Sequence, residues 1–404
     1  MTNLQNNENN TDNVQLEDLS TESMNESPEE NITLEEIHHH GHKKPIKSVS
    51  ASGKIKYQKD KKHKILKRVL IGVLIFLLVA VIAVFAAYQI SKHLGKKELL
   101  AGNKNASIHQ INDADSKDDG QTVTYKGEKY RYNENLVSIV FMGVDKSELG
   151  SDVVGSAGQA DAVYIFTYDT ESNQCNLIPV SRETMTEVRV RSVSGSDMKL
   201  EKMQLCLAYA YGDGKESSCT NTLEALSRIF YNIPFTNYIS LNWDAIGPLN
   251  DAIGGIKLKS LNDIHTDRST IKKGDNVTLM GNDAWSYVKY RDTSKLTSNV
   301  DRLNRQKQYI NAYISKFVPM AKSDFSVATN LIDTANEYMY TNITTNKLVY
   351  IASEILPSVY SSEDFNFISI DGKIKQGETY AEFYPDETSL YETVLKIFYI
   401  KEKN

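Results

Sequence analysis

Hydrophobic positions form one unbroken run early in the chain and recur at short, regular spacings later. The run extends from Val69 to Ile90 and contains no charged residue. Its 22 residues, at about 1.5 Å rise each in a helix, span roughly 33 Å, enough for a hydrocarbon core about 30 Å thick. A buried helix of a soluble protein would show a polar face at this length, and a signal peptide would be shorter and begin earlier. The run therefore predicts a transmembrane helix over 69–90.

The charged residues on either side of this run predict its orientation. Residues 43–68 contain 11 Lys or Arg and one acid, whereas the segment just beyond the run has only Lys92, Lys96 and Lys97. Cytoplasmic flanks carry the excess of Lys and Arg, so the N-terminus is predicted in the cytoplasm and the larger C-terminal part outside. We therefore expect a single-pass protein of the cell membrane.

Residues 1–68 are predicted to form a disordered cytoplasmic tail. Residues 1–42 carry ten acids and no Lys or Arg, and the basic stretch follows them. So few hydrophobic residues cannot offset the entropy of ordering the chain. The basic part is expected to lie against anionic lipid headgroups.

Beyond the run, a polar segment is followed by a long stretch with regular hydrophobic spacing. Residues 91–135 show no sustained hydrophobic period and predict an extracytoplasmic stalk. Residues 136–398 are long enough for one domain with a sizeable core, which leaves 399–404 as a C-terminal tail.

Strand-like and helix-like patterns interleave within this domain. Hydrophobic spacings of three and four residues predict helices over 219–230 and 300–317, and Asn282 is expected to cap a helix over 283–289. The strands predicted from β-branched and aromatic residues cover 136–142, 162–168 and 174–180. This order predicts an α/β fold in which helices cover both faces of a mixed sheet.

Charge and cysteine content exclude several classes of function. Residues 69–404 carry 35 basic and 41 acidic residues, so electrostatic binding of nucleic acid is not expected. Three cysteines do not make a disulfide framework for a domain of this size, and they are not spaced as metal ligands. A bridge between Cys206 and Cys219 and buried free thiols both remain open.

Polar residues with useful chemistry stand where the first three predicted strands begin or end. Asp145 follows the first strand, Asp161 precedes the second and Arg182 follows the third. If these strands run up, down and up, all three residues lie at one edge of the sheet. Two carboxylates suit a Mg²⁺ ion, and an arginine suits a phosphate oxygen.

A second cationic group follows later in the chain. Lys289 and Arg291 close one predicted helix, and Arg302 and Gln306 share a face of the next, with Arg305 nearby. The charge of a diphosphate requires both a metal and cationic donors. The acids and bases together therefore predict a phosphate-bearing ligand, bound outside the membrane and near it.

Eight segments of the domain stand in an informative order. They read FMGVD (141–145), GQAD (158–161), PVSRET (179–184), LAYAYGDG (207–214), NWDAIGPLNDAIGGI (242–256), LMGNDAWSYVKYRD (279–292), VDRLNRQKQYI (300–310) and EFYPDETSL (382–390). No single segment is specific, but the series resembles the LytR-CpsA-Psr family, whose domain also bears the older label cell-envelope-related transcriptional attenuator. The similarity runs from about Leu136 to Phe398.

This resemblance implies an α-β-α sandwich with a mixed central sheet and an apolar cleft for a polyprenyl lipid. It also implies a transferase that attaches a glycopolymer from a polyprenyl-pyrophosphate carrier to peptidoglycan, assisted by Mg²⁺. Asp145 and Asp161 match the family's metal site. The residues that match its pyrophosphate contacts are Arg182, Lys289, Arg291, Arg302 and Gln306, and the three arginines among them match catalytic positions.

The chain departs from the family pattern at several of these positions. The pattern usually has Asp at Glu183 and Arg at Lys289, and this chain has Gln159 and Gln204 in place of an Arg and a Lys. Asn299 stands where the family has an acid, which is a candidate base for the acceptor hydroxyl. An asparagine cannot accept a proton in that role.

Two readings of function stay open because of these departures. One is the transferase. The other is a catalytically weakened relative that binds polyprenyl phosphates as a sensor, scaffold or cell-envelope regulator. A third class, the DNA-binding regulator, is disfavoured because the folded domain is acidic and outside the membrane. For the missing base, Asp301 and Glu183 are the groups to examine.

Overall fold

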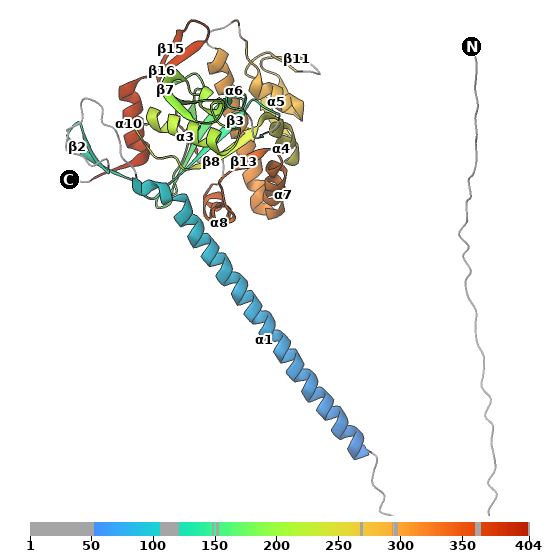
Figure 1. Ribbon diagram of the computed structural model, residues 1–404. Helices are drawn as coiled ribbons and strands as arrows, with labels where there is room; N and C mark the ends of the chain where they lie inside the picture. Colours follow the sequence, from blue (N-terminus) through green and yellow to red (C-terminus); the bar gives the residue numbers. More distant parts are fainter. Residues whose placement is uncertain are drawn as a thin grey trace, which may run out of the picture. The chain divides into compact units, whose positions relative to one another are not determined.

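The computed structural model describes the chain from Ser52 onward, with short gaps (Figure 1). The described residues are 52–105, 121–147, 149–150, 153–266, 270–292, 294, 298–359 and 365–402. Residues 1–51, which include most of the predicted disordered tail, lie outside them.

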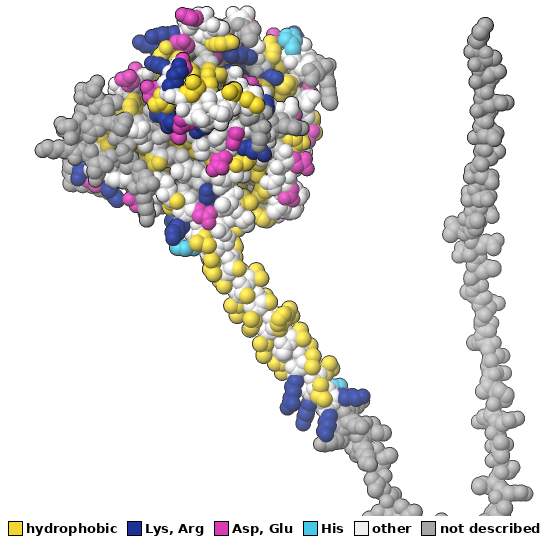
Figure 2. Space-filling view, in the orientation of Figure 1, with side chains coloured by type: hydrophobic (Ala, Val, Ile, Leu, Met, Phe, Trp, Pro, Cys, Tyr) yellow, Lys and Arg dark blue, Asp and Glu magenta, His cyan; other side chains and the backbone are white. Residues whose placement is uncertain are grey.

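Helix α1 (Ser52–Leu99) contains the hydrophobic run and extends beyond it on both sides. From Val69 to Ile90 its hydrophobic side chains are exposed around the helix, which is long and apolar enough to span a bilayer. Figure 2 shows this hydrophobic band, with Lys and Arg side chains gathered at its N-terminal end. The prediction of disorder is wrong for residues 52–68, because this lysine-rich, proline-free sequence continues the helix.

The C-terminal end of α1 packs against α8 (Thr345–Tyr350) and the turn after it. The Ser91 hydroxyl donates a 2.8 Å hydrogen bond to Oδ1 of Asn346, and Leu99 is only 1% exposed. Gly95 lies so close to the Asn346 carbonyl that any side chain there would clash. Residues 91–99 are therefore a docked helix end and not the polar stalk predicted from their composition.

Six strands form the central sheet. They are β3 (Leu136–Val144), β4 (Ala160–Asp169), β5 (Cys175–Val180), β8 (Asn237–Asn242), β13 (Met339–Thr341) and β14 (Phe365–Phe367), in the spatial order β13-β8-β3-β4-β5-β14. Strand β4 is antiparallel to both β3 and β5, whereas β3 is parallel to β8 and β5 is parallel to β14. The three strands expected from the sequence are confirmed as β3, β4 and β5.

Helices cover both faces of this sheet, because the central strands are hydrophobic on both sides. In β3, Val140 and Met142 point into one hydrophobic core, and Val137 and Ile139 point into the other. The first core includes α2 (Leu207–Ala210), α3 (Glu216–Ile229) and α10 (Glu387–Phe398). The second includes α6 (Ser298–Ser323), α8, η3 (Ile351–Ile355) and α9 (Leu356–Ser358). These layers confirm the α-β-α sandwich with a mixed sheet.

A third hydrophobic core joins α6 to a group of shorter elements. These are α4 (Ile246–Ala252), β9 (Ile256–Lys259), β10 (Ile264–His265), β11 (Thr270–Ile271), β12 (Asn276–Leu279), α5 (Asn282–Lys289) and α7 (Phe325–Asn336). The short helix η2 (Trp243–Ala245) directly precedes α4. Gly281, at φ +49°, precedes α5, so Asn282 is its first residue and not the expected cap.

Several short strands were not predicted. The hairpins are β6 (Met185–Arg191) with β7 (Asp197–Gln204) and β15 (Gly372–Gln376) with β16 (Ala381–Pro385), and η1 (Ala101–Asn105) follows α1. A further sheet contains β1 (Thr122–Tyr125), β2 (Glu128–Tyr132) and β17 (Tyr399–Lys401). The stalk predicted over 91–135 and the tail predicted over 399–404 therefore meet in this sheet. Alternation over four or five residues is too short to distinguish such strands from a polar stalk.

Candidate functional site

The site lies at the edge of the central sheet where β3 ends, β4 begins and β5 ends. Asp145 directly follows β3, Asp161 is the second residue of β4, and Arg182 stands two residues after β5. Because β4 is antiparallel to both neighbours, these positions meet at one edge, as the strand order predicts. The β3–β4 register shifts at Val144, beside the site.

Asp161 is the centre of the site. Its side chain is 8% exposed, and its two oxygens face two arginines. Arg182 Nη1 pairs with Oδ1, and Nη1 of Arg302, on α6, lies 3.6 Å from Oδ2. Burial raises the pKa of Asp161, while both guanidinium groups act in the opposite direction. The two arginines thus offset part of the penalty that burial places on the charged form of this carboxylate, and the net direction of the pKa shift is upward.

Asp145 is the exposed acid of the pair. Its Oδ1 accepts a hydrogen bond from the backbone N–H of Gln159, in the turn before β4. Gly158, at φ +83°, allows this turn to wrap around the carboxylate, and a Cβ there would lie 2.8 Å from Asp145 Oδ1. The Gln159 side chain accepts a hydrogen bond from Arg182. Gln159 therefore orients both Asp145 and Arg182 without adding a charge to the site.

Buried side chains on the far side of Arg182 form a second layer. Nη2 of Arg291 lies 2.7 Å from Oε1 of Glu183, which is 2% exposed. Asn299 donates to the Ser181 hydroxyl at 2.9 Å and accepts from Arg302 Nη2 at 2.7 Å. Asn299 is thus a buried link between α6 and the end of β5.

Gln306 and Lys289 lie in different surroundings. Gln306, one turn after Arg302 on α6, accepts a 3.0 Å hydrogen bond from the Tyr164 hydroxyl. The exposed Lys289 places its ammonium 4.6 Å from the Trp243 ring and 4.0 Å from the Trp285 ring. Within the described part of the chain, Lys289 contacts these two rings, and no ion pair joins it to the carboxylates of the site. Its pyrophosphate role stays a prediction.

The structure adds neighbours that the sequence reasoning did not single out. Arg182 Nη2 donates to Sγ of Cys206 at 3.2 Å, and burial raises the pKa of this thiol to about 11. Arg291 Nε donates to the Ser298 hydroxyl at 3.0 Å. All three cysteines are free and buried, which answers the question left open by their spacing. Nothing in sequence separates such thiols from ordinary core residues.

Three buried polar atoms of this site have no hydrogen-bond partner among the described residues. They are Nε of Arg182, Nε of Arg302 and Oε2 of Glu183. Leaving such an atom unpaired costs about 1–3 kcal/mol, and more when the group is charged. The two donors belong to the arginines that flank Asp161, and the acceptor belongs to the carboxylate beside Arg291. Such unpaired atoms indicate a place for a polar, charged ligand.

The acids of the site fit a divalent cation only in company with a ligand. The described residues contain no group of three His, Cys, Asp or Glu that could hold a metal. Asp145 is exposed and has an oxygen beyond the one that binds Gln159, whereas both oxygens of Asp161 face arginines. Mg²⁺ commonly binds one or two carboxylates together with substrate phosphates and water. Asp145 and Asp161 fit such a shared site.

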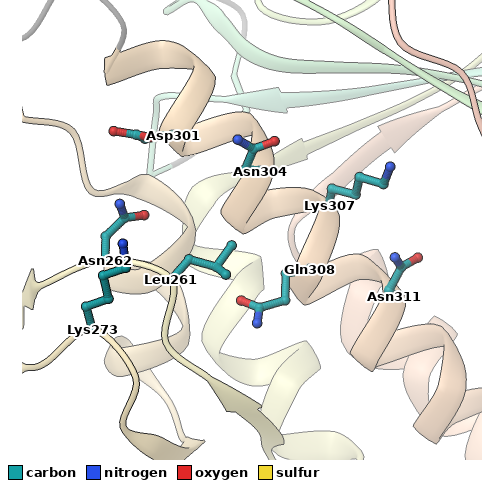
Figure 3. Close-up of a pocket in the computed structure, with 8 residues that line it drawn as sticks. All are labelled: Leu261, Asn262, Lys273, Asp301, Asn304, Lys307, Gln308 and Asn311. Atoms are coloured by element: carbon teal, nitrogen blue, oxygen red, sulfur yellow. The ribbon is translucent and has the colours of Figure 1, made fainter.

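A polar hollow of about 530 Å³ borders another face of α6 (Figure 3). Its lining residues are Leu261, Asn262, Lys273, Asp301, Asn304, Lys307, Gln308 and Asn311. Asp301 lines this hollow, whereas the neighbouring Arg302 pairs with Asp161. Asp301 is therefore badly placed to replace the acid that the family has at the position of Asn299.

Comparison with known proteins identifies the family of this chain. The LytR_cpsA_psr family model matches residues 99–396. The polyisoprenyl-teichoic acid–peptidoglycan teichoic acid transferase TagU of Bacillus licheniformis is 25% identical over 217 residues, which cover 54% of this chain and 61% of that protein. TagU of Bacillus anthracis is 25% identical over 263 residues, or 64% and 77% of the two chains.

Solved structures share the fold. The crystal structure of B. subtilis TagV matches with a TM-score of 0.52 at 24% identity, covering 65% of this chain and 95% of that one. Protein gbs0355 from Streptococcus agalactiae matches with a TM-score of 0.52 at 18% identity, covering 65% and 86%. Because the family model matches most of the chain, this protein belongs to the LytR-CpsA-Psr family.

Proposed function

We propose that this protein is a membrane-anchored transferase that moves a glycopolymer from a polyprenyl-pyrophosphate carrier to peptidoglycan. The observation that carries the proposal is a pair of buried guanidinium groups at Asp161, on Arg182 and Arg302, each of which has an Nε without a partner among the described residues. Guanidinium N–H groups suit the oxygens of a pyrophosphate. The TagU relatives, named for polyisoprenyl-teichoic acid and peptidoglycan, support this choice of donor and acceptor.

One face of α6 supports a lipid-linked donor. Arg302 and Gln306 are followed at helical spacing by Ile310, Ile314 and Phe317, which pack against the second hydrophobic core. That core also contains Leu99, the last residue of α1, and Leu100 packs against it. A pyrophosphate held by Arg302 would therefore have its prenyl chain along a hydrophobic path toward the membrane-spanning helix.

The arginines supply the electrostatic part of the reaction. In the proposed step, an acceptor hydroxyl attacks the phosphorus that carries the glycopolymer, and the bond from this phosphorus to the lipid phosphate oxygen breaks. Arg182, Arg291 and Arg302 stabilise the charge that develops on the leaving lipid monophosphate. Because buried neighbours hold these arginines, they lose little freedom when the reaction begins.

Asp145 and Asp161 would hold Mg²⁺ together with the pyrophosphate. The ion, when bound, would neutralise part of the phosphate charge. For Asp161 to contribute an oxygen, Arg182 or Arg302 must turn from the carboxylate toward the phosphate. The acid would thus give up an arginine to the substrate as it gains the cation.

The proposed location follows from the flanks of α1. The excess of Lys and Arg before the span places the N-terminus in the cytoplasm and the folded domain outside, where peptidoglycan lies. A cysteine introduced at Gly120 should react with an impermeant thiol reagent on intact cells, and one at Ser20 should not. The reverse pattern would contradict this location.

The transfer reaction itself is the test of function. The full chain in detergent is mixed with peptidoglycan and a prenyl-pyrophosphate-linked saccharide that carries a label in the sugar. We expect label in peptidoglycan and an equal amount of prenyl monophosphate, and a loss of about 10²–10³-fold in Arg182→Gln. Arg228→Gln, which removes an arginine paired with Glu224 on α3, is the matched control and should keep full activity.

A second function rests on the uncharged residues of the site. Gln159 and Asn299 occupy positions within the buried network and contribute no charge. These residues favour a protein that binds polyprenyl pyrophosphate without transferring the glycopolymer. Tight binding of the labelled donor with no transfer to peptidoglycan would support this second function.

A further inference from the structure

The site contains a buried carboxylate, that of Glu183, with one oxygen that has no partner in the described part of the chain. Of the two Glu183 oxygens, Oε1 accepts the hydrogen bond of Arg291, and Oε2 is buried without a partner among the described residues. The Glu183 side chain is 3% exposed. A lone buried carboxylate oxygen is costly, so a hydroxyl or a water that donates to it when substrate binds would relieve this cost.

The other carboxylates near the site are already engaged or point elsewhere. Asp161 faces arginines with both oxygens, and Asp145 is an exposed proposed ligand of the cation. Asp301 lines the hollow on another face of α6. At the position where the family pattern has an acid, Asn299 holds Ser181 and Arg302 through its amide.

Glu183 lies within the same network as Asn299. Its backbone N–H donates to the Ser181 hydroxyl at 3.3 Å, and that hydroxyl also accepts the hydrogen bond of the Asn299 amide. A second support comes from the backbone carbonyl of Glu183, which accepts a 2.8 Å hydrogen bond from the Phe383 N–H. Arg291 then fixes the orientation of the carboxylate at its other oxygen.

We propose that Glu183 is the catalytic base of this protein, in place of the acid missing at Asn299. This inference rests on the proposed transfer reaction. The acceptor hydroxyl forms its bond to the phosphorus that carries the glycopolymer, and its proton passes to Oε2 of Glu183. The bond from that phosphorus to the lipid phosphate oxygen breaks, and the lipid monophosphate leaves with the electron pair. The proton is then released to solvent, which restores the carboxylate.

Substitution of Glu183 tests this assignment in the full chain in detergent. Glu183→Gln keeps an oxygen for Arg291 and removes the proton acceptor, so kcat should fall by about 10²–10⁴-fold. The affinity for farnesyl pyrophosphate should stay within about threefold, because the arginines remain. Glu187→Gln is the matched control, since Glu187 lies four residues later on β6 with an exposed side chain, and it should behave as the parent.

A second variant separates a base from a structural residue. In the Glu183→Gln background, Asn299→Asp places a carboxylate at the neighbouring position. We expect kcat of this double variant to be at least tenfold higher than kcat of Glu183→Gln alone. A purely structural role of Glu183 predicts no such rescue. If Glu183→Gln does not fold, Glu183→Asp replaces it, with slower transfer and retained affinity expected.

The outcomes distinguish this inference from the proposed function. If the parent transfers label and Glu183→Gln transfers equally fast, Glu183 is not the base while the transferase assignment stands. If Glu183→Gln is slow and Asn299→Asp restores nothing, the catalytic role is also rejected. If the parent binds farnesyl pyrophosphate and never transfers, the proposed function itself fails.

Discussion

Two faces of α6 present buried arginines three residues apart, and the comparison separates function from support. Arg302 and Arg305 are 3% and 1% exposed, and burial lowers the pKa of both. Arg305 donates to the Tyr287 carbonyl at 3.0 Å, to Asn262 Oδ1 at 2.8 Å, and to the Tyr290 carbonyl. Arg302 faces Asp161 and Asn299 and keeps its Nε unpaired.

The two arginines differ in the hydrogen-bond partners of their guanidinium nitrogens. Arg305 uses all three nitrogens to bind α5, the residue that follows it and the loop before β10, so each nitrogen already has a protein partner. Arg302 retains a buried donor, its Nε, that has no partner among the described residues. A buried charge with complete partners is a structural element, whereas one with incomplete partners indicates a binding site.

We expect the largest effect from replacing Arg302, the arginine whose hydrogen bonds are incomplete. Arg302→Gln should lower transfer by about 10²–10³-fold, because a donor aimed at the phosphate is lost. Its thermal unfolding midpoint should stay close to that of the parent. Transfer of labelled saccharide to peptidoglycan measures the first effect, and an equal rate in the variant would contradict the role of Arg302.

Replacing Arg305, whose nitrogens all have partners, should lower stability and leave the transfer rate almost unchanged. Arg305→Gln leaves the Tyr287 and Tyr290 carbonyls without donors, and we expect a loss of about 3 kcal/mol in the free energy of unfolding. The rate per folded molecule should remain within about threefold of the parent at low temperature. Chemical denaturation of the full chain in detergent measures the loss, and a stable but inactive Arg305→Gln would reverse our comparison.

The strand order was sufficient to bring Asp145, Asp161 and Arg182 together, because antiparallel neighbours return the chain to one edge of the sheet. Residue spacing alone could not rank Arg302 above Arg305, since both fall on a helix and their partners come from distant elements. The family resemblance was needed to select Arg302. Likewise, nothing in the sequence placed the Lys289 ammonium over the Trp rings. Tertiary contacts decide such cases.

The errors in the domain boundaries have a common cause. Residues 52–68 and 91–99 lack a hydrophobic period, yet they continue the helix of the apolar run between them. In the same way, β2 gains its place in the fold from pairing with β17, more than 260 residues later in the chain. A local hydrophobic pattern does not reveal stabilisation by an adjoining helix or by a strand distant in the sequence.

A smaller effect is expected at the acid between the two arginines. In Asp161→Asn, Arg182 and Arg302 no longer pair with a charge, and one proposed ligand of Mg²⁺ is weakened. Binding of farnesyl pyrophosphate should become at least about tenfold less dependent on Mg²⁺, while binding without the cation should persist. Calorimetric titrations with and without Mg²⁺ check this, and unchanged Mg²⁺ dependence would place the cation elsewhere.

The smallest effect is expected at two glutamines that repeat the comparison. Gln306 binds the Tyr164 hydroxyl on the sheet side, and Gln308 binds the Tyr287 hydroxyl at 2.5 Å on the other face. Gln306→Ala should weaken farnesyl pyrophosphate binding by a few fold, and Gln308→Ala should instead lower the free energy of unfolding by about 1 kcal/mol. Equal effects of both variants on binding would mean that the faces are not distinct.

The most direct test of the account is the affinity of the full chain in detergent for farnesyl pyrophosphate with Mg²⁺, measured by calorimetry for the parent, Arg302→Gln and Arg305→Gln. The account predicts binding by the parent, a loss of at least about tenfold in Arg302→Gln, and near-parent affinity in folded Arg305→Gln. Equal affinity in the parent and Arg302→Gln, or no binding by the parent, would contradict a pyrophosphate site at this edge of the sheet.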